Sequence, residues 1–309
     1  MAFARIGRWL GRHHQDTLPT RLHRRRIYVL PTPSGLAFVA ALLVLLIGSI
    51  NYGLNLGHAL VFLLAGLGVV STVQACRNLS ALVVTQIHAE PVFAGAPLIV
   101  QLTLENPQPR ARTAVRVELA GQATPLDIAP ADRAIASLPQ PTRQRGRLPV
   151  GPITISTTWP LGLVRAWSVV RTESSSLVYP APEADPPPLP HGHPSDGGRP
   201  QGVGDEDFSG LRPHRRNDSP RHIAWKAVAA GRPMLTKEFT GHQTESIVLD
   251  WTTLPDALNP DARAARLAAW ALEAHTRGLK YALCTPAERL PAGRGAAHLA
   301  ACLARLAVA

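Results

Sequence analysis

Two long apolar runs lie close together near the start of the chain. Residues 27–76 contain no Asp, Glu, Lys or Arg, and within them the runs 34–50 and 56–75 consist mostly of Gly, Ala, Val, Leu, Ile and Phe. Each run approaches the ~20 residues that cross a hydrocarbon core. The link between them, with Gly53 among polar neighbours, is typical of a tight turn. The pattern predicts two antiparallel transmembrane helices within residues 32–76.

Basic residues mark both ends of this predicted hairpin. Four arginines lie between positions 21 and 26, and Arg77 follows the second run. Because positive charge is retained on the cytoplasmic side, we expect both termini in the cytoplasm and the basic segment 1–31 close to anionic lipid headgroups. A cleaved signal peptide is disfavoured, since a second apolar run follows directly. A buried helical hairpin and a basic RNA-binding arm are the remaining alternatives.

The pattern changes after the hairpin. Short runs of apolar and β-branched residues alternate with polar ones, as in half-buried strands, and Pro or Gly interrupts them at short intervals. The predicted strands are 82–87, 98–104, 115–119, 153–159, 164–170 and 177–179. Several short strands separated by turns predict an all-β, Ig-like sandwich over residues 80–180.

A linker is predicted next, over residues 181–203. This segment has seven prolines and no apolar periodicity, so an extended loop is expected. His191 and His193 form a His-x-His pair within it. No further ligand with metal-site spacing lies nearby, so a loop without metal is favoured.

A dense charged stretch follows, over residues 204–239. It holds twelve of the chain's Asp, Glu, Lys and Arg residues and two of its three lysines. An Asp-Ser-Pro sequence predicts a helix that begins at Asp218 and ends near Ala230, because these residues suit a helix cap and first turn. Helical spacing then places Arg221 beside Trp225, where the guanidinium is expected to stack on the indole.

The end of the chain alternates strands and helices. The predicted elements are strand 247–250, helix 261–276, strand 280–285 and helix 295–308. This order predicts parallel strands, and it makes residues 204–309 the charged stretch plus a small α/β domain. Asp250 ends its strand at the edge where open α/β sheets bind ligands.

Charge and cysteine content narrow the function classes. The formal net charge is +11 at pH 7, and seven arginines but one aspartate lie in the first 26 residues. A membrane-proximal basic tail accounts for this charge, and no aromatic platform accompanies it, so nucleic acid is not an expected partner. The three cysteines Cys76, Cys284 and Cys302 show no Cys-x-x-Cys spacing, which predicts buried thiols.

Two groups of residues carry a resemblance to a known family. In the β-rich part they are Arg145-Gly146-Arg147 and Pro160-Leu161-Gly162-Leu163. In the charged stretch they are the candidate interaction residues Asp207, Phe208, Leu211, Arg212, Asp218, Arg221, Ile223, Trp225 and Lys226. Over nearly the whole chain the sequence resembles the bacterial domain-of-unknown-function family 58, whose members join a two-helix anchor to a β-domain and a von Willebrand factor A-like domain. The chain departs from the family at His214, Asn217 and Ala230, where members usually carry Tyr, Gly and Arg.

The resemblance implies a non-catalytic adaptor or assembly factor anchored in the bacterial inner membrane. Its implied partners are the lipid bilayer, other membrane proteins and a MoxR-type AAA+ ATPase, because family members are often encoded beside such ATPases. It implies no cofactor. The charged stretch has a second interpretation, as an internal ion network of Arg212, Asp218, Arg221 and Lys226 that joins the two domains.

A membrane-bound hydrolase is the alternative function. Ser209, His214 and Asp218 supply the residue types of a nucleophile, a base and an acid, but the sequence has no GxSxG elbow, P-loop or HExxH motif. The resemblance also implies a truncated von Willebrand factor A-like domain whose Asp-x-Ser-x-Ser metal motif is degenerate. Asp250 and Thr252 occupy its first two positions, and the third holds a leucine, which cannot ligate a metal. No bound metal is predicted.

Overall fold

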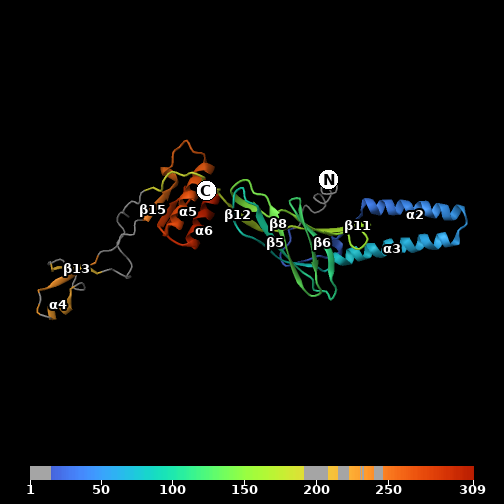
Figure 1. The fold of residues 1–309 in the computed structure, drawn as a ribbon, viewed down its shortest axis with the longest axis horizontal. Coiled ribbons are helices and arrows are strands. Elements are labelled where there is room, and N and C mark those ends of the chain that lie inside the picture. The colour runs from blue at the N-terminus through green and yellow to red at the C-terminus, as the bar shows by residue number, and fades with distance from the viewer. Residues whose placement is uncertain (1–14, 191–207, 215–222, 230, 232, 240–245) are drawn as a thin grey trace. The chain divides into compact units, whose positions relative to one another are not determined.

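The computed structural model describes residues 15–190, 208–214, 223–229, 231, 233–239 and 246–309 (Figure 1). They fall into two compact units. The first runs to Pro182 and includes Leu306–Val308, and the second holds Glu183–Arg305 and Ala309. In chain order the protein has two apolar helices, a mostly β region with antiparallel sheets and a C-terminal α/β part.

The two apolar helices are α2 (Pro33–Asn51) and α3 (Asn55–Leu79) (Figure 1). Both are long and apolar enough to cross a membrane, and only 11% and 17% of their most apolar windows are buried. A helix that is apolar on all sides belongs in a protein core or in a membrane. A protein core would bury these side chains, and here most of them are exposed. The second helix ends beyond the predicted limit at Cys76, because its last turn packs into the β region.

The start of α2 is fixed to the β region. Thr32 caps the helix, since its Oγ1 accepts a hydrogen bond from Gly35 N at 3.1 Å, and Pro33 occupies the first turn. Thr32 also donates from its backbone N to Leu163 O at 2.9 Å and from its hydroxyl to Gly162 O at 2.5 Å. A Cβ added at Gly35 would overlap the carbonyl of Leu163, so the close approach of helix and loop requires glycine.

Three sheets make up the β region. The four-stranded sheet has the order β1 (Thr20–Arg21), β3 (Val83–Ala89), β5 (Leu98–Glu105), β8 (Arg133–Gln140). The five-stranded sheet has the order β2 (Tyr28–Pro31), β11 (Val164–Val170), β10 (Ile153–Thr157), β6 (Arg112–Leu119), β7 (Gln122–Ile128). The three-stranded sheet has the order β4 (Val92–Phe93), β12 (Ser175–Tyr179), β9 (Gly146–Pro149). Within these sheets only β4 and β12 pair in parallel.

Two of these strands precede the helical hairpin, where the sequence predicts only a basic tail over residues 1–31. Strand β1 pairs with β3, strand β2 pairs with β11, and Leu22 between them is only 2% exposed. A 3-10 turn, η1 (Arg24–Arg26), connects the two strands. Both strands are short and flank a run of arginines. For this reason the sequence shows no clear alternation of apolar and polar residues there. The hairpin is thus inserted between β2 and β3 of one β region.

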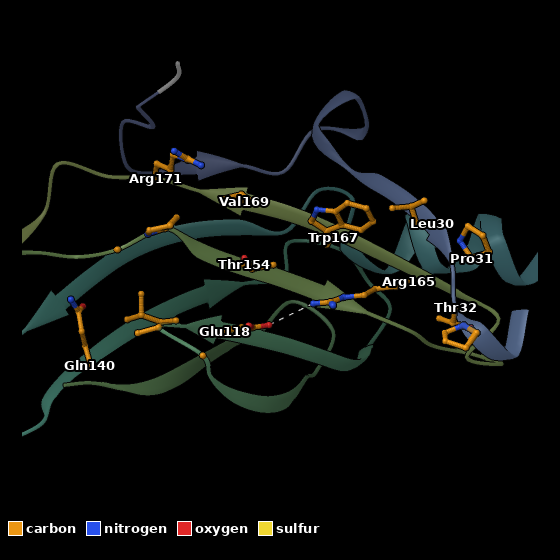
Figure 2. Close-up of a pocket in the computed structure, with 16 residues that line it drawn as sticks. Leu30, Pro31, Thr32, Glu118, Gln140, Thr154, Arg165, Trp167, Val169 and Arg171 are labelled. Atoms are coloured by element: carbon orange, nitrogen blue, oxygen red, sulfur yellow. Dashed lines mark ion pairs between the residues drawn. The ribbon is translucent and has the colours of Figure 1, made fainter. Parts of the chain in front are cut away.

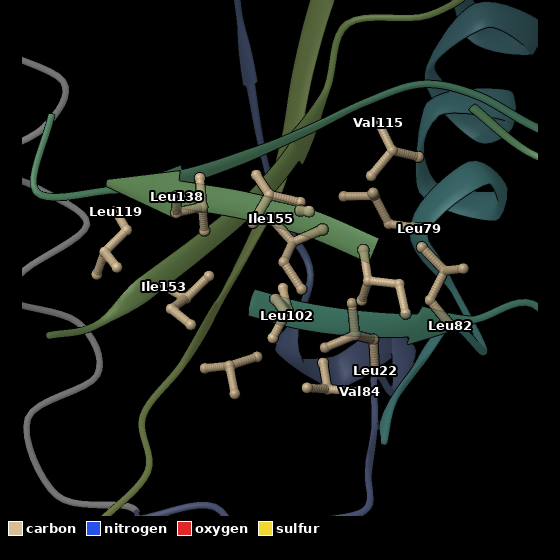
Figure 3. Close-up of a cluster of buried hydrophobic side chains, with 14 of the residues drawn as sticks. Leu22, Leu79, Leu82, Val84, Leu102, Val115, Leu119, Leu138, Ile153 and Ile155 are labelled. Carbon is tan, nitrogen blue, oxygen red and sulfur yellow. The ribbon is translucent and has the colours of Figure 1, made fainter. Parts of the chain in front are cut away.

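Alternate residues of the two larger sheets fill a single core (Figure 3). In β5, Leu98, Val100, Leu102 and Leu104 are all 0% exposed, while the positions between them face outward. This period of two is what the sequence pattern of a half-buried strand requires. The core draws on both sheets and on the end of α3, through Leu79, Leu82, Val84, Val115, Leu119, Leu138, Ile153 and Ile155.

A charged side chain, Arg112 of β6, is wholly buried where α3 meets the sheets. Its Nε donates to Asn106 Oδ1 at 3.0 Å, its Nη2 to the carbonyl of Ser80 at 2.9 Å and its Nη1 to the carbonyl of Arg77. Asn106 is also buried and donates from its amide to two further carbonyls at 2.7 and 2.9 Å. Arg112 therefore supplies donors to helix-end carbonyls that have no partner within the helix.

Burial lowers the pKa of Arg112 to about 10, and the neighbouring Arg110 adds to this effect. A guanidinium with this pKa keeps its charge at neutral pH. Removing a charge from water is costly unless the group is hydrogen-bonded, and each of the three nitrogens of Arg112 donates to an acceptor.

The C-terminal α/β part contains a three-stranded sheet and two helices in the described residues. Strand β15 (Ser246–Asp250) pairs in parallel with β16 (Lys280–Cys284), which pairs antiparallel with β17 (Arg289–Gly293). The 3-10 turn η3 (Trp251–Thr253) and helix α5 (Pro260–Thr276) connect the parallel strands, and α6 (Ala296–Val308) follows β17. The predicted parallel pair is confirmed, whereas β17 was not predicted.

Replacing Arg112 with alanine tests the buried network. Arg112→Ala removes the side-chain donor of the Ser80 carbonyl and one donor each from the Arg77 carbonyl and Asn106 Oδ1, and it leaves a cavity in the core, so we expect a loss of about 3 kcal/mol or more of unfolding free energy. Arg116→Ala, at an exposed position of the same strand, is the control and should change it by less than ~1 kcal/mol. The measurement is the unfolding midpoint of the full chain in detergent. Equal effects of the two changes would refute the role given to Arg112.

Two glycines of the same helix provide a second test. Gly35→Ala should lower the thermal midpoint of the first unit, because the new methyl group meets backbone that cannot move aside. Gly48→Ala is the matched control, since no atom lies within 4 Å of a Cβ at that position. If both variants unfold at the same temperature, the close approach of α2 to Leu163 is not a stability requirement.

Candidate functional site

The charged stretch forms a β-hairpin with a short helix in its described residues. Strand β13 (Phe208–Pro213) pairs antiparallel with β14 (Leu235–Phe239), and helix α4 (Trp225–Ala229) lies between them in sequence. The register places Phe208 opposite Phe239, Leu211 opposite Lys237 and Arg212 opposite Thr236. Lys226 lies in α4. Other predicted residues lie outside the described residues: Asp207, Asp218, Arg221, His191 and His193.

Ile223 differs from its prediction. Helical spacing placed it on a helix, but it forms a β-bridge with Thr236 and is only 7% exposed. Ala224 N also donates to Leu235 O at 2.9 Å. Backbone pairing with β14 therefore takes precedence here, as the preference of β-branched isoleucine for extended structure allows. The helix that the structure describes begins two residues later, at Trp225.

Trp225 is 57% exposed, unlike Ile223 beside it. Met234, close to the start of β14, is 45% exposed. Large apolar side chains in water are costly unless a partner covers them, and tryptophan dominates many protein interfaces. Among the predicted interaction residues, Trp225 has the exposure that a contact residue needs.

His214 bears on the hydrolase alternative. Its Nδ1 lies 2.9 Å from Thr236 Oγ1, a partner on the neighbouring strand. This contact connects the end of β13 to β14. The imidazole of His214 therefore stabilises the pairing of the two strands. Asp218 lies outside the described residues, so the predicted combination of serine, histidine and aspartate stays a prediction.

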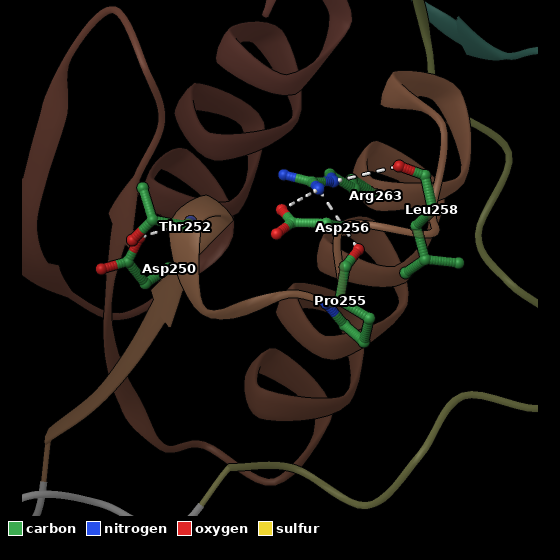
Figure 4. A network of polar contacts seen from close by, with 6 residues as sticks. All are labelled: Asp250, Thr252, Pro255, Asp256, Leu258 and Arg263. Carbon is green, nitrogen blue, oxygen red and sulfur yellow. Dashed lines mark hydrogen bonds and ion pairs between the residues drawn. The ribbon is translucent and has the colours of Figure 1, made fainter.

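Asp250 ends β15 and caps the turn that follows (Figure 4). Its Oδ1 accepts hydrogen bonds from the backbone N and the Oγ1 of Thr252, each at 2.8 Å. Thr253 Oγ1 donates to Asp250 O at 2.9 Å, and Leu254 is only 4% exposed. The third position of the motif is thus a buried apolar side chain, and these residues do not fit a bound metal ion. Within the described residues, no group of three or more His, Cys, Asp or Glu side chains is placed to hold one.

Arg263 of α5 holds the next loop (Figure 4). Its Nη2 donates to Asp256 Oδ1 at 2.9 Å and to Pro255 O at 3.2 Å, and its Nε donates to Leu258 O at 3.1 Å. These bonds fix the loop between β15 and α5. Polar groups at this edge of the sheet thus stabilise turns.

The cysteines of the second unit are unsuited to nucleophilic chemistry. Burial raises the pKa of the Cys302 thiol to about 11. Burial, and then the nearby carboxylate of Asp250, raises the pKa of the Cys284 thiol. Because the thiolate is the nucleophile, both groups stay protonated and unreactive at neutral pH.

The first part of the predicted linker packs against α5. Arg266 donates from Nε and Nη2 to the two carboxylate oxygens of Glu183, at 2.8 and 2.9 Å. Trp270 Nε1 donates to Pro187 O at 2.7 Å. The hydrogen bonds from Arg266 hold the pKa of Glu183 below its usual value. The segment has no regular secondary structure, as predicted, but it is attached to the helix.

A cavity of about 640 Å³ lies on the outer face of the five-stranded sheet (Figure 2). This volume is within the ~300–1,000 Å³ of ordinary ligand pockets. Trp167 and Val169 line it from β11, Thr154 from β10 and Glu118 from β6. One end is formed by Leu30 and the residues directly before α2. The sequence analysis missed this cavity.

The other end of the cavity is polar. Gln140 and Arg171 lie there, away from Leu30 (Figure 2). Gln140 Oε1 and Arg171 Nε are buried and have no hydrogen-bond partner among the described residues. In the middle, Arg165 pairs with Glu118 at 3.6 Å. A signal for this face was present in the sequence, since positions 165, 167, 169 and 171 alternate with core positions and include tryptophan and valine.

Comparison of the chain with family models, curated proteins and solved structures gives no match. Its function must be argued from the residues and geometry described above.

The contact between Glu183 and Arg266 predicts a pH dependence. The pKa of Glu183 is lower in the folded chain than in the unfolded one, so the contact stabilises the fold above the ordinary Glu pKa of ~4.3 and is lost as pH falls through the folded value. Glu183→Gln should therefore lower the midpoint of the second unit at pH 7 and have little effect near pH 3. The measurement is differential scanning calorimetry.

Glu273→Gln is the control for this experiment. Glu273 pairs with Arg277 at the surface of the same helix, and surface pairs of this kind contribute little. A difference between Glu183→Gln and the unmodified chain that stays constant from pH 7 to pH 3 would contradict the assignment.

Proposed function

We propose that the protein is a membrane-anchored, non-catalytic adaptor that presents its C-terminal part to a cytosolic AAA+ ATPase of the MoxR type. The observation that carries the anchoring is the exposure of α2 and α3, which leaves two apolar helices of membrane-spanning length without a protein cover in the described residues. Burying this surface in lipid removes it from water.

The connections of the hairpin support its orientation. The strand before α2 is β2 and the strand after α3 is β3, and both belong to the same β region. Both ends of the hairpin must therefore lie on one side of the membrane. Basic residues occur at both ends, at Arg24–Arg26 and Arg77, which favours the cytoplasmic side. The proposed location is the bacterial inner membrane with both termini in the cytoplasm.

The family assignment is part of the proposal. The signature from Asp207 to Lys226 and the two-helix, β and α/β order support membership of domain-of-unknown-function family 58. On this assignment the β region is an Ig-like sandwich and the α/β part a truncated von Willebrand factor A-like domain. The MoxR partnership rests on the same resemblance.

The proposed partner surface includes Trp225. Its side chain is 57% exposed at the start of α4, next to Ile223 and Ala224, whose backbone is bonded to β14. The interaction and the internal ion network are compatible, because Trp225 is not one of the network residues.

A binding experiment tests the adaptor function. The full chain in detergent is combined with a purified MoxR-type AAA+ ATPase from the same organism, with and without ATP. We expect nucleotide-dependent binding and a loss of about thirtyfold or more in affinity with Trp225→Ala, as for an aromatic residue at the centre of an interface. Lack of binding by the unmodified chain would overturn the proposal.

Leu161→Ala is the matched control. Leu161 is a large apolar side chain with 48% exposure in the first unit, so its removal should leave the affinity unchanged. If Leu161→Ala and Trp225→Ala weaken binding equally, Trp225 does not define the partner surface. Unfolding midpoints of both variants show whether each remains folded.

A further inference from the structure

The cavity on the five-stranded sheet is a groove that starts at the membrane helix. Its floor follows β11, where Val164 pairs with Pro31 of β2 and Arg171 follows the last strand residue. Seven residue steps of ~3.3 Å give the groove a length of about 23 Å. Because Pro31 is two residues before α2, one end lies where the first apolar helix begins.

Beside the ion pair of Arg165 and Glu118, the groove has an apolar lining. Trp167 stands opposite Tyr28 with ring centroids 5.8 Å apart, and Val169 stands opposite Thr154. Trp167 is only 7% exposed although it faces away from the core. Gly151 lies at the side of the groove, where an added Cβ would contact Leu119 at 3.4 Å. These residues suit a hydrocarbon chain rather than a polar one.

The far end of the groove favours an anion. Arg171 Nε is buried without a partner among the described residues, which is costly unless a ligand supplies an acceptor. Asp16 is an acid in contact with Arg171, but only through the backbone. Its Oδ2 accepts a hydrogen bond from Arg171 N at 3.1 Å, and its Oδ1 accepts one from Arg26 Nη1 at 2.5 Å. Arg171 is therefore not neutralised by that acid. The other acid of the groove, Glu118, is paired with Arg165.

A peptide strand fits this groove poorly. The groove lies on the face of the sheet, where the backbone groups of β10 are already paired with β6 and β11. Addition of a strand needs an open edge, so a peptide would gain only side-chain contacts. An amphiphile needs no backbone pairing.

We propose that the groove holds one anionic phospholipid from the adjoining membrane leaflet, with its headgroup at Arg171 and Gln140 and one acyl chain along Trp167 toward Leu30. The length supports this, since about 23 Å exceeds the ~15 Å depth of one leaflet's hydrocarbon and leaves room for a headgroup. Arginine is well suited to a phosphate, and Gln140 accepts or donates to headgroup hydroxyls. The site rests on the membrane anchoring of the proposed function.

Photolabelling tests the site. The full chain is reconstituted in phosphatidylcholine vesicles that contain a trace of phosphatidylglycerol with a diazirine at the end of one acyl chain, or phosphatidylcholine with the same group. After illumination, labelled peptides are mapped. The phosphatidylglycerol probe should label β2 and β11 near Leu30 and Trp167 about tenfold more than the phosphatidylcholine probe, the effect of one charge-assisted hydrogen bond.

Three variants define the site. Arg171→Gln should abolish the preference for the anionic probe and leave the fold intact, because Arg171 is held through its backbone. Thr154→Trp should fill the groove and remove the strand label. Gln101→Trp, on the exposed face of β5, should leave it unchanged. Thermal midpoints confirm that each variant is folded, and Arg171→Gln remains informative if Thr154→Trp is not.

The label on the helices separates the two proposals. Labelling of α2 and α3 without β2 and β11, or equal strand labelling by both probes, overturns the lipid site and leaves the anchor intact. Absence of label on α2 and α3 overturns the membrane anchoring and the lipid site with it.

Discussion

The junction between the apolar helices and the β region depends on one buried charge. Arg112 donates to the carbonyls of Arg77 and Ser80 at the end of α3, and to Asn106 within the loop after β5. A helix that leaves a membrane must satisfy its last carbonyls, and water usually does so. Here the guanidinium of Arg112 donates to these carbonyls in place of water. The end of α3 can therefore lie inside the core with Leu79 and Leu82. The start of α2 is tied by Thr32 and Gly35. Both ends of the hairpin are thus parts of one folded unit, not flexible tethers.

This construction places the groove. Strand β2 continues directly toward α2, and it is the edge strand of the five-stranded sheet. A sheet that begins at an apolar helix and carries tryptophan on its outer face provides a surface that continues from the apolar hairpin. Arg171 stands at the far end of that surface with its Nε unpartnered among the described residues. A buried donor of this kind is tolerated where a ligand supplies the hydrogen-bond acceptor. The lipid proposal therefore rests on the fold and not on the sequence signature.

The sequence predicted the elements that have a clear hydrophobic pattern within their own residues. The apolar runs predicted α2 and α3, and alternation predicted β5, β10 and β11. Strands β1 and β2 were missed because arginines surround them and each is short. Strand β17 was missed because a strand–helix–strand order favours parallel pairing, whereas β16 and β17 form a hairpin. The alternation along β11 indicated an outer face, but not the groove itself, because Leu30, Glu118, Gln140 and Arg171 are far apart in sequence and come together only through strand pairing and the packing of two sheets. Ile223 shows that pairing with a neighbouring strand overrides helical spacing.

The polar groups described at the edge of the α/β sheet stabilise a turn. Asp250 occupies the position where an open sheet places ligands, yet its Oδ1 takes both donors of Thr252, and Leu254 turns inward. A metal ion needs several oxygen ligands around it, and a buried leucine cannot supply one. Asp250 and Thr252 together close the turn after β15. In the proposed adaptor function the partner binds elsewhere, through residues such as Trp225, and this edge contributes to the stability of the unit.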